Sequence, residues 1–402
     1  MSGMVIIGAG HAAGQAAASL RQEKYEGSIT IIGDEPHVPY QRPPLSKQYL
    51  SGEQAIDRVY LRPQKFYEDK NIDLKLGVSA TAIDRAAKTV QLDNGEQIAY
   101  DKLIISTGSR PRKLNIEGSD LAGIHYLRTI ADVDAIRAEM KPKRNLVIVG
   151  GGYIGLEVAS VGIDQGLNVH VLEMEERILQ RVTTAEMSAY YHNLHTGRGV
   201  QIHTGTTVSG FAGDQHVQQV LCGDQAFDAD LVVVGIGIIP NVELAQDAGL
   251  TCDNGIVVDE HCRTSDPDIF AAGDCTNHPN PLLDRRLRLE SVPNAMEQAR
   301  VCAANMLGGD KTYAAIPWFW SDQYELKLQM VGFSADGDQQ VVRGNMAENQ
   351  FAVFYLNEGR VVAADAVNSP KEFMICKQLI GVEVDPARLA DPETDLKTLL
   401  AS

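Results

Sequence analysis

Positive charge is scarce in this sequence. Its 36 Lys and Arg residues stand against 53 Asp and Glu residues, which gives a formal net charge of −17. A protein that holds nucleic acid through phosphate contacts needs a basic surface, so the composition argues against that class of partner. No apolar run approaches the ~18 residues that a membrane-spanning helix requires. The first residues have neither the basic start nor the apolar segment of a secretory signal, and we expect a cytoplasmic protein.

Cysteine is also sparse, and its spacing is uninformative. None of the cysteines forms a CxxC or another spacing typical of metal sites, and none precedes Cys222. We expect separate thiols in a reducing compartment, and no metal site. The six residues are Cys222, Cys252, Cys262, Cys275, Cys302 and Cys376.

What the sequence does contain is one plan used twice: a strand, a glycine turn, a helix, a strand and an acid. The first copy runs from Val5 to Glu35, and the second from Leu146 to Glu173. Short apolar strands joined by helical crossovers predict a parallel sheet that is buried on both faces. We therefore expect an α/β protein with two Rossmann-like nucleotide-binding domains.

The two glycine turns are candidate dinucleotide sites. Such a turn lets the backbone approach a pyrophosphate, and the helix that follows offers free N–H groups and the positive end of its dipole. A single pattern of this kind is a weak signal, but two complete copies make chance a poor explanation. The candidate positions are Gly8, Gly10 and Ala13 in the first turn, Gly150, Gly152 and Gly155 in the second, and Gly235 in the strand end that closes the second copy.

An acid ends the second strand of each copy, where it would accept hydrogen bonds from an adenosine ribose. Asp34 and Glu35 stand at this place in the first copy, and Glu173 in the second. A 2′-phosphate beside Glu173 and Glu175–Glu176 would be repelled, which predicts NADH rather than NADPH. Arg177 is the one reservation.

Later segments complete the domain plan. Residues 264–274 resemble the element in which flavoproteins with two dinucleotide sites hold the ribityl chain of FAD, so Asp274 assigns FAD to the first site and NAD to the second. From about Trp318 onward, alternating strand patterns predict an antiparallel C-terminal α+β domain. The expected boundaries are 1–112 and 243–317 for an FAD-binding domain, 113–242 for an NAD-binding domain and 318–402 for the C-terminal domain.

Five motifs carry a resemblance that covers nearly the whole chain: Tyr40–Lys47, Tyr126–Thr129, Gly150–Glu157, Glu290–Ala295 and Pro317–Gln323. They resemble the glutathione-reductase-like flavoproteins and, within them, the NADH:ferredoxin reductases of the putidaredoxin reductase type. The resemblance implies that Lys47 lies near the reactive edge of the flavin ring, Glu157 beside the nicotinamide and Trp320 near the far end of the ring. It also implies that Lys47 and Glu157 form an opposite-charge pair near the flavin edge. It implies FAD contacts at Ala12, Asp34 or Glu35, Arg42, Lys47, Ala80, Arg128, Asp274 and Val292.

The position of the cysteines then bears on the reaction. Disulfide reductases of this fold carry a reactive Cys pair after the first nucleotide unit, and the peroxidase and NADH-oxidase relatives carry a single Cys at a similar depth. Here Arg42-Pro43-Pro44 occupies that region. Thiolate attack on a disulfide is therefore not expected, and the electrons must pass directly to an external acceptor.

The resemblance implies that this acceptor is a 2Fe–2S ferredoxin that feeds an oxygenase. A haem monooxygenase is favoured, and a Rieske dioxygenase system is the near alternative. An NADH oxidase and an interaction protein of the apoptosis-inducing-factor type stay open as alternatives from other classes. We expect a monomer that docks the ferredoxin through Arg62 and Arg300, with Arg285, Arg286 and Arg288 as a second group.

Overall fold

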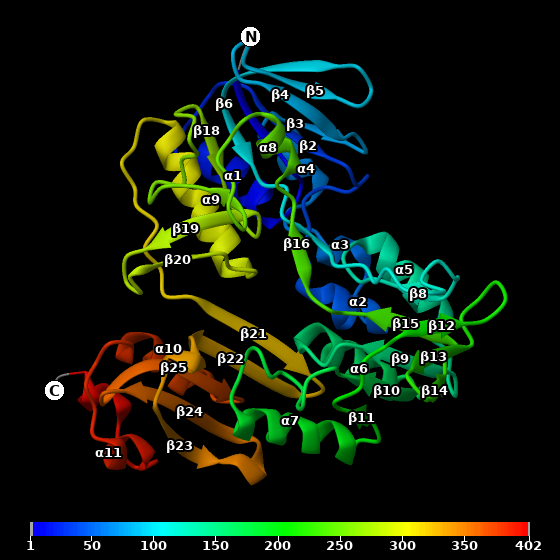
Figure 1. The fold of residues 1–402 in the computed structure, drawn as a ribbon. Helices are drawn as coiled ribbons and strands as arrows, with labels where there is room; N and C mark the ends of the chain where they lie inside the picture. Colours follow the sequence, from blue (N-terminus) through cyan, green and yellow to red (C-terminus); the bar gives the residue numbers. More distant parts are fainter. Residues whose placement is uncertain (1–2, 401–402) are drawn as a thin grey trace. The chain divides into compact units, whose positions relative to one another are not determined.

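The computed structural model describes residues 3–400 of the chain (Figure 1). The chain divides into two compact units, each built from segments that are distant in sequence. The first unit consists of Met1–Arg42, Gln54–Arg110 and Ile238–Pro317. The second unit consists of Pro43–Glu53, Pro111–Gly237 and Trp318–Ser402.

A seven-stranded sheet forms the centre of the first unit, in the order β3-β2-β1-β6-β5-β4, with β18 paired to β6. The parallel strands are β1 (Gly3–Ile7), β2 (Ile29–Gly33), β3 (Ile72–Leu76), β6 (Gln97–Ile105) and β18 (Ile269–Ala271). The antiparallel extension consists of β4 (Ala80–Asp84) and β5 (Thr89–Leu92).

Strand β1 shows why this sheet is parallel and central. Met4 and Ile6 pack into one apolar cluster, and Val5 and Ile7 pack into another. Successive side chains of a strand point to opposite faces, so both faces of the sheet are covered. The expected parallel sheet buried on both faces is therefore confirmed for this unit.

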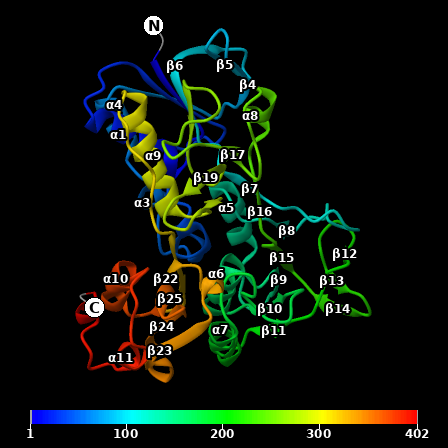
Figure 2. The ribbon, with the colours of Figure 1, turned by 60° about the vertical axis from the view of Figure 1, so that its left-hand side comes forward.

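Helices cover the sheet of the first unit. Helix α1 (His11–Gln22) lies alongside α9 (Val292–Met306), although α9 begins 270 positions after α1 ends, as both ribbon views show (Figures 1 and 2). Alanines on α1 and on α9 share one cluster. The remaining elements are α3 (Ile56–Val59), α4 (Gln64–Asp69), α8 (Glu243–Asp247), β17 (Ile256–Val257), β19 (Thr276–Asn280), β20 (Arg285–Leu287) and the pair β7 (Ser109–Pro111) with β16 (Ile238–Pro240).

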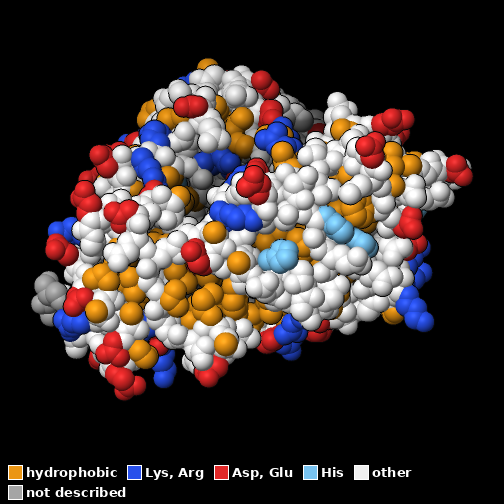
Figure 3. Space-filling model, turned by 60° about the horizontal axis from the view of Figure 1, so that its bottom comes forward, with side chains coloured by type: hydrophobic (Ala, Val, Ile, Leu, Met, Phe, Trp, Pro, Cys, Tyr) orange, Lys and Arg blue, Asp and Glu red, His pale blue; other side chains and the backbone are white. Residues whose placement is uncertain are grey.

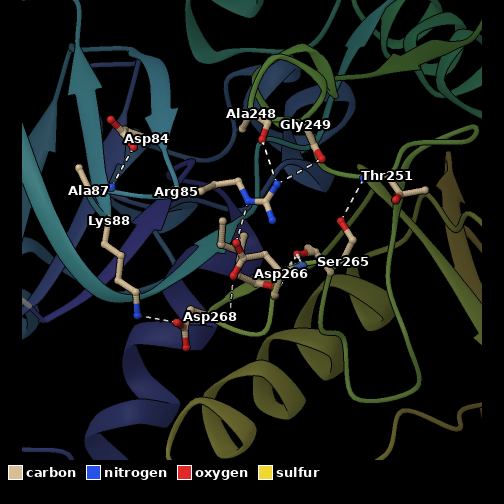
Figure 4. A network of polar contacts seen from close by, with 12 residues as sticks. Asp84, Arg85, Ala87, Lys88, Ala248, Gly249, Thr251, Ser265, Asp266 and Asp268 are labelled. Atoms are coloured by element: carbon tan, nitrogen blue, oxygen red, sulfur yellow. Dashed lines mark hydrogen bonds and ion pairs between the residues drawn. The ribbon is translucent and has the colours of Figure 1, made fainter.

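Ion pairs and hydrogen bonds fasten the segment before β18 to the β4–β5 hairpin (Figure 4). Arg85 Nε lies 2.7 Å from Asp266 Oδ2, and Arg85 Nη1 donates to the carbonyls of Ala248 and Gly249 at 3.3 Å. Lys88 and Lys102 both pair with the carboxylate of Asp268. These contacts join the early and late segments of the first unit.

The second unit contains another parallel sheet, in the order β11-β10-β9-β15-β8. Its strands are β8 (Ile124–His125), β9 (Asn145–Val149), β10 (Asn168–Leu172), β11 (Gln201–His203) and β15 (Leu231–Val234). Its helices are α5 (Ile130–Glu139), α6 (Tyr153–Asp164) and α7 (Ala185–Gly197), with η1 (Pro43–Ser46) and α2 (Gln48–Ser51) contributed by the short N-terminal segment. A three-stranded antiparallel sheet completes it: β12 (Gly210–Ala212), β13 (Gln219–Cys222) and β14 (Gln225–Asp228).

The same unit includes the predicted C-terminal α+β structure, which is confirmed. Its antiparallel sheet has the order β21-β22-β25-β24-β23. The strands are β21 (Trp318–Gln323), β22 (Leu326–Gly332), β23 (Gln339–Asn345), β24 (Gln350–Asn357) and β25 (Arg360–Val367). The helices are η2 (Ser334–Asp336), η3 (Met346–Glu348), α10 (Pro370–Leu379), α11 (Pro386–Ala390) and η4 (Leu396–Leu399).

One apolar cluster joins this antiparallel sheet to the helices of the nucleotide-binding sheet. Leu156 on α6 and Tyr191 on α7 pack with Leu328 on β22 and Phe351 on β24. Helix α6 also packs against β21. The C-terminal sheet is thus positioned directly beside the helix that begins at the second glycine turn.

On the face shown in Figure 3, acidic and basic side chains are both present, and hydrophobic side chains gather in the lower left of the view. Residues 3–400 contain no helix with the length and apolar character needed to cross a membrane.

Candidate cofactor-binding and catalytic site

The first glycine turn has the geometry of a phosphate cradle. Gly8 has a φ of +103°, and a Cβ there would lie 2.2 Å from the carbonyl oxygen of Ser106. Gly10 is the N-cap of α1, no side chain caps the helix, and a Cβ at Gly10 would meet nothing within 4 Å. Unsatisfied N–H groups at such a helix start are a binding site for anions, so the turn fits a pyrophosphate.

The second turn repeats this geometry at α6. Gly150 has a φ of +109°, and its Cβ would lie 2.5 Å from the carbonyl oxygen of Gly235. A Cβ on Gly155 would lie 2.2 Å from the carbonyl oxygen of Gly150, so helix and turn are in close contact. Gly152 is the N-cap of α6, lacks a side-chain cap, and faces open space. The second turn therefore also fits a pyrophosphate.

Glu173 directly follows β10 and lies against the second turn. Its Oε2 accepts the backbone N–H of Gly151 at 2.7 Å, and its Oε1 accepts that of Glu175 at 2.9 Å. The Arg177 guanidinium donates to the carbonyls of Thr184 and Gln180 at 3.2 and 3.1 Å. Arg177 thus holds the loop that follows Glu173.

The expectation that Asp34 and Glu35 stand at the same place as Glu173 is wrong in register. Ile7 pairs with Ile32, and Val149 pairs with Leu172, so the residue that matches Glu173 is Gly33. A Cβ at Gly33 would lie 2.4 Å from the Cβ of Ala9, which explains why a side chain is absent there. The two acids follow one and two residues later.

Glu35 is held by its neighbours, whereas Asp34 is exposed. The hydroxyl of Tyr40 donates to Glu35 Oε2 at 2.7 Å, and Arg42 Nη2 lies 3.1 Å from Oε1. The backbone N–H of Gly77 donates to the carbonyl of Glu35, which brings the segment leading to the half-buried Ala80 beside these residues. The first unit thus gathers an ordered polar group at the carboxyl edge of its sheet.

Asp274 lies at that same edge. It follows β18, and its Oδ2 accepts the hydroxyl of Ser109 at 2.8 Å. A Cβ on the neighbouring Gly273 would lie 3.7 Å from the Cβ atoms of both Ala12 on α1 and Ala295 on α9. The first glycine turn, Asp274 and the start of α9 at Val292 therefore meet, as two parallel strands with a shared carboxyl edge require.

A buried ion pair stands at the start of α6 in the second unit. Lys47 Nζ lies 2.7 Å from Glu157 Oε2, and the two side chains are 9% and 1% exposed. Lys47 Nζ also donates to the carbonyl of Pro43 at 3.3 Å, and the Ser46 hydroxyl donates to Glu157 Oε2 at 2.5 Å. The ion pair that the resemblance suggested between Lys47 and Glu157 is present.

Strand β21 supplies the other oxygen of Glu157 with a partner. The hydroxyl of Ser321 donates to Oε1 at 2.6 Å, and Gln323 Nε2 donates to the Ser321 oxygen at 3.2 Å. Trp320, which directly precedes Ser321, is half-buried, and its ring centroid lies 5.6 Å from that of Trp318. Arg128 is half-buried directly before Thr129, the N-cap of α5.

Four polar residues near Glu157 were not expected from the sequence: Ser46, Ser321, Gln323 and the buried His195. Ser321 and Gln323 lie on one face of β21. Polar residues at every second position are typical of a solvent-facing side of an antiparallel sheet, so the sequence pattern did not indicate that these two are buried. His195 follows Met187 and Tyr191 at intervals of four residues, so it lies on the apolar face of α7.

Burial raises the thiol pKa of five of the six cysteines. All six are unpaired. Burial raises the pKa of Cys275 to about 11 and that of Cys376 to about 12, and it also raises the pKa of Cys222, Cys252 and Cys302. Thiols with raised pKa values are poor nucleophiles at neutral pH.

Comparison with known proteins agrees with these sites. The model of the pyridine nucleotide-disulphide oxidoreductases matches residues 2–299, and that of the reductase C-terminal domain matches residues 318–400. Putidaredoxin reductase of Pseudomonas putida is 46% identical over 99% of this chain and 97% of its own length. The ferredoxin–NAD(+) reductase component of the anthranilate 1,2-dioxygenase system of Burkholderia cepacia is 46% identical over 98% of each chain. The covalent putidaredoxin reductase–putidaredoxin complex matches with a TM-score of 0.96 and 45% identity, over 100% of this chain and 98% of that chain.

The chain belongs to the pyridine nucleotide-disulphide oxidoreductase family. Within this family it is a flavoprotein ferredoxin reductase of the putidaredoxin reductase type. The expected family, fold class, enzyme class, cofactors and ferredoxin partner are thereby confirmed. The disulfide chemistry in the family's name has no counterpart among the six cysteines of this chain.

Proposed function

We propose that this protein oxidises NADH and delivers the electrons singly to a 2Fe–2S ferredoxin of an oxygenase system, with no thiol step. The observation that carries the proposal is the Lys47–Glu157 pair, which is buried beside the second glycine turn. The resemblance places Arg42-Pro43-Pro44 in the region where disulfide reductases of this fold carry their reactive cysteines. FAD, when bound, accepts a hydride and releases electrons one at a time. The residues of the chain bind, orient and shield the two cofactors.

The glycine turns support the assignment of the two sites. The first turn, with Gly8, Gly10, Ala12 and Ala13, would hold the pyrophosphate of FAD through the N-terminus of α1. Asp274 would hold the ribityl chain, and the other proposed FAD contacts are Asp34, Glu35, Arg42, Lys47, Ala80, Arg128 and Val292. The second turn, with Gly150, Gly152 and Gly155 and the neighbouring Gly235, would hold the pyrophosphate of NADH.

The coenzyme preference is proposed from Glu173. Both of its oxygens accept backbone N–H groups, so the carboxylate is fixed where an adenosine ribose would lie. A 2′-phosphate would meet a fixed negative charge, and Arg177 is already committed to two carbonyls. Repulsion without compensation favours NADH.

The role proposed for Lys47 and Glu157 is to position the reactants. Because Lys47 and Glu157 pair with each other, neither buried charge lacks a partner before the nicotinamide binds. A cation near the reactive edge of the ring would stabilise negative charge that develops there during hydride transfer. Trp320 would border the same space from β21.

The acceptor would dock through arginines of the first unit. Arg62 and Arg300 are exposed, and neither forms an ion pair within residues 3–400. Arg62 lies over the ring of Phe66, which limits its motion. The second group is less suitable, because Arg286 donates to Asn277 and to the Val258 carbonyl and Arg288 is paired with Glu290.

Two oxygenase classes are candidates for the end of the electron path. We favour a haem monooxygenase, on the motifs at 290–295 and 317–323. A Rieske dioxygenase system is the second candidate, because the reductase component of the anthranilate 1,2-dioxygenase system is as similar to this chain as putidaredoxin reductase is.

We also propose the domain boundaries, the oligomeric state and the location of the protein. The domains are 1–112 with 243–317, 113–242 and 318–402. The protein works as a monomer. It works in the cytoplasm, where six unpaired thiols are compatible with the redox conditions.

One assay tests the proposed function: NADH turnover with oxygen alone, with ferricyanide, and with an added 2Fe–2S ferredoxin. We expect slow turnover with oxygen and fast reduction of the ferredoxin. A rate with oxygen that an added ferredoxin does not increase would indicate an oxidase and contradict the proposal. Ferredoxins from a haem monooxygenase and from a Rieske dioxygenase, compared at equal concentration, distinguish the two candidate systems.

A further inference from the structure

A line of buried hydrogen bonds leads from Glu157 toward the surface of the second unit. From Ser321 the line continues to Gln323, whose Oε1 lies 2.8 Å from His195 Nε2. It ends at Tyr324, whose hydroxyl lies 3.1 Å from His195 Nδ1. Ser321 and Gln323 are 1% exposed and His195 is 0% exposed. The line joins β21, the hairpin turn after it and α7 to the carboxylate at the start of α6.

The charge of Glu157 determines which way each hydrogen points. The Ser321 hydroxyl has one hydrogen, and its 2.6 Å contact with an ionised carboxylate requires that hydrogen. The Ser321 oxygen must then accept from Gln323, so the amide turns its Nε2 to Ser321 and its Oε1 to His195. His195 consequently carries its proton on Nε2, and its Nδ1 accepts from the Tyr324 hydroxyl.

The environment of His195 keeps it neutral. Burial lowers its pKa to about 4, and the nearby Arg198 and His192 act in the same direction, whereas the hydrogen bond to Gln323 opposes them. A neutral imidazole has one donor and one acceptor, which matches its two partners. Every polar atom that the line offers is therefore used.

Tyr324 is held in a conformation that most residues avoid. Its φ is +55°, in the left-handed region, at the turn between β21 and β22. A residue with a side chain is strained there by roughly 1–2 kcal/mol, and glycine would be the ordinary choice. The ring is retained by contacts with His195, at 5.1 Å between ring centroids, and with Arg198, at 4.3 Å. The strained backbone of Tyr324 thus belongs to the residue whose hydroxyl contacts His195 at the end of the line.

We propose that Gln323 and His195 are positioning residues for Glu157: they hold the Ser321 hydroxyl as a donor to Oε1, so that Oε2 stays with Lys47 and Ser46. Neither residue touches a reactant. The line is not a path for protons, because the amide of Gln323 would have to pass through a high-energy tautomer to relay one. The inference rests on the proposed placement of Glu157 beside the nicotinamide.

The first test reads the line without catalysis. Nitrogen-15 NMR of the FAD-loaded protein, labelled at histidine, distinguishes the two imidazole tautomers, and the His195 signal is identified by its loss in His195→Leu. We expect a neutral His195 with its proton on Nε2 from pH 6 to 8. A proton on Nδ1, or a mixture of the two tautomers, would overturn the ordered line.

The second test compares matched variants in single-turnover reduction of the FAD-loaded protein by NADH. His195→Leu and Gln323→Met remove the polar atoms at similar volume, and we expect the rate to fall about 10- to 100-fold, as when partners of catalytic groups are removed elsewhere. His195→Gln keeps an N–H near the place of Nε2 and should restore most of the rate. The Kd for NADH should change much less than the rate. His192→Leu, on the same helix but outside the line, is the control and should leave the rate unchanged.

Glu157→Gln separates the two possible failures. If Glu157→Gln reduces the rate but His195→Leu and Gln323→Met do not, the positioning role is overturned and the proposed function stands. If Glu157→Gln leaves the rate unchanged, the proposed role of Glu157 fails, and the positioning role with it. Circular dichroism and FAD content confirm that each variant is folded, and where one is not, the tautomer of the wild-type protein decides.

Discussion

Lys47 and Glu157 are 110 positions apart in sequence, yet Lys47 Nζ lies 2.7 Å from Glu157 Oε2 and both side chains are buried. A buried ion pair contributes little by itself, because desolvation of two charges offsets their attraction. Breaking such a pair is costly, since one charge is left buried without a partner. The pair is therefore a sensitive point for both stability and reaction.

Lys47→Met should destabilise the protein and slow hydride transfer. We expect a loss of about 3–5 kcal/mol in the free energy of unfolding, reduced to the extent that Ser46 and Ser321 still hold the carboxylate. Urea denaturation of the FAD-loaded protein measures the first effect, and stopped-flow bleaching of the flavin by NADH measures the second. Lys75→Met is the control, because Lys75 pairs with Glu96 at a half-exposed site where a loss below about 1 kcal/mol is expected. Equal effects of the two substitutions would contradict the role of burial.

Glu173→Arg should narrow or reverse the preference for NADH. Exchanging repulsion for attraction near the 2′-phosphate should move the ratio of kcat/KM values for the two coenzymes by at least about tenfold, that is ~1.4 kcal/mol. Glu173 also accepts two backbone N–H groups, so the substitution will disturb the turn. Glu173→Gln keeps an acceptor oxygen without the charge, and its ratio should lie between those of the wild type and Glu173→Arg. Equal use of NADH and NADPH by the wild-type protein would refute the basis of this prediction.

Asp365 on β25 should make the protein less stable as the pH rises from about 4 to about 6. Burial raises its pKa to about 6, although the Tyr355 and Thr183 hydroxyls donate to it at 2.8 and 3.0 Å and partly oppose the shift. The folded state then binds more protons than the unfolded state in this range, so stability falls with rising pH and stays lower above it.

Asp365→Asn should remove this dependence. The variant should gain stability relative to the wild type at pH 8 but not at pH 4, with a difference on the order of 3 kcal/mol from a shift of ~2 pKa units. Thermal unfolding across this pH range is the measurement. Asp214→Asn, at an exposed site, should show no such trend. A gain that is larger at pH 4 would mean that Asp365 is stabilised in its charged form.

Local features of the fold could be predicted from the sequence. The glycine turns, their helices and their strands were predictable because the tight turn, the helix start and the apolar strand are set by neighbouring residues. The match of Asp34 and Glu35 to Glu173 failed because it depends on how β2 pairs with β1: Ile7 pairs with Ile32, so Gly33 takes the place that Glu173 has in the second copy. That pairing between strands is not given by the spacing of residues in the sequence.

The residues that form hydrogen bonds on the Ser321 side of Glu157 could not be predicted from the sequence either. Ser321, Gln323 and His195 come from a strand and a helix that meet only when the C-terminal sheet packs on α6 and α7. The Lys47–Glu157 pair itself was expected from the family resemblance and not from the spacing of the two residues. A chain of hydrogen bonds between distant elements is a property of packing, and the sequence shows only its members.

Arg62→Glu and Arg300→Glu test the proposed docking surface. Ferredoxins of this type are acidic, so two negatively charged proteins repel at long range, and a productive complex needs exposed cations where it forms. Salt screens the long-range repulsion beyond about 8 Å, while close ion pairs persist at moderate salt, so ferredoxin reduction should pass through an optimum in salt concentration. Each substitution should raise the KM for ferredoxin on the order of fivefold, which corresponds to the loss of about 1 kcal/mol from an exposed charge contact. Ferricyanide reduction by NADH should change little, because a small acceptor needs no docking surface.

The control is Lys141→Glu, which changes the net charge equally at another exposed position and should leave the KM for ferredoxin near that of the wild type. If Arg62→Glu and Arg300→Glu both reduce ferredoxin like the wild type, the docking surface lies elsewhere, and the second group of arginines, Arg285, Arg286 and Arg288, is the next to test.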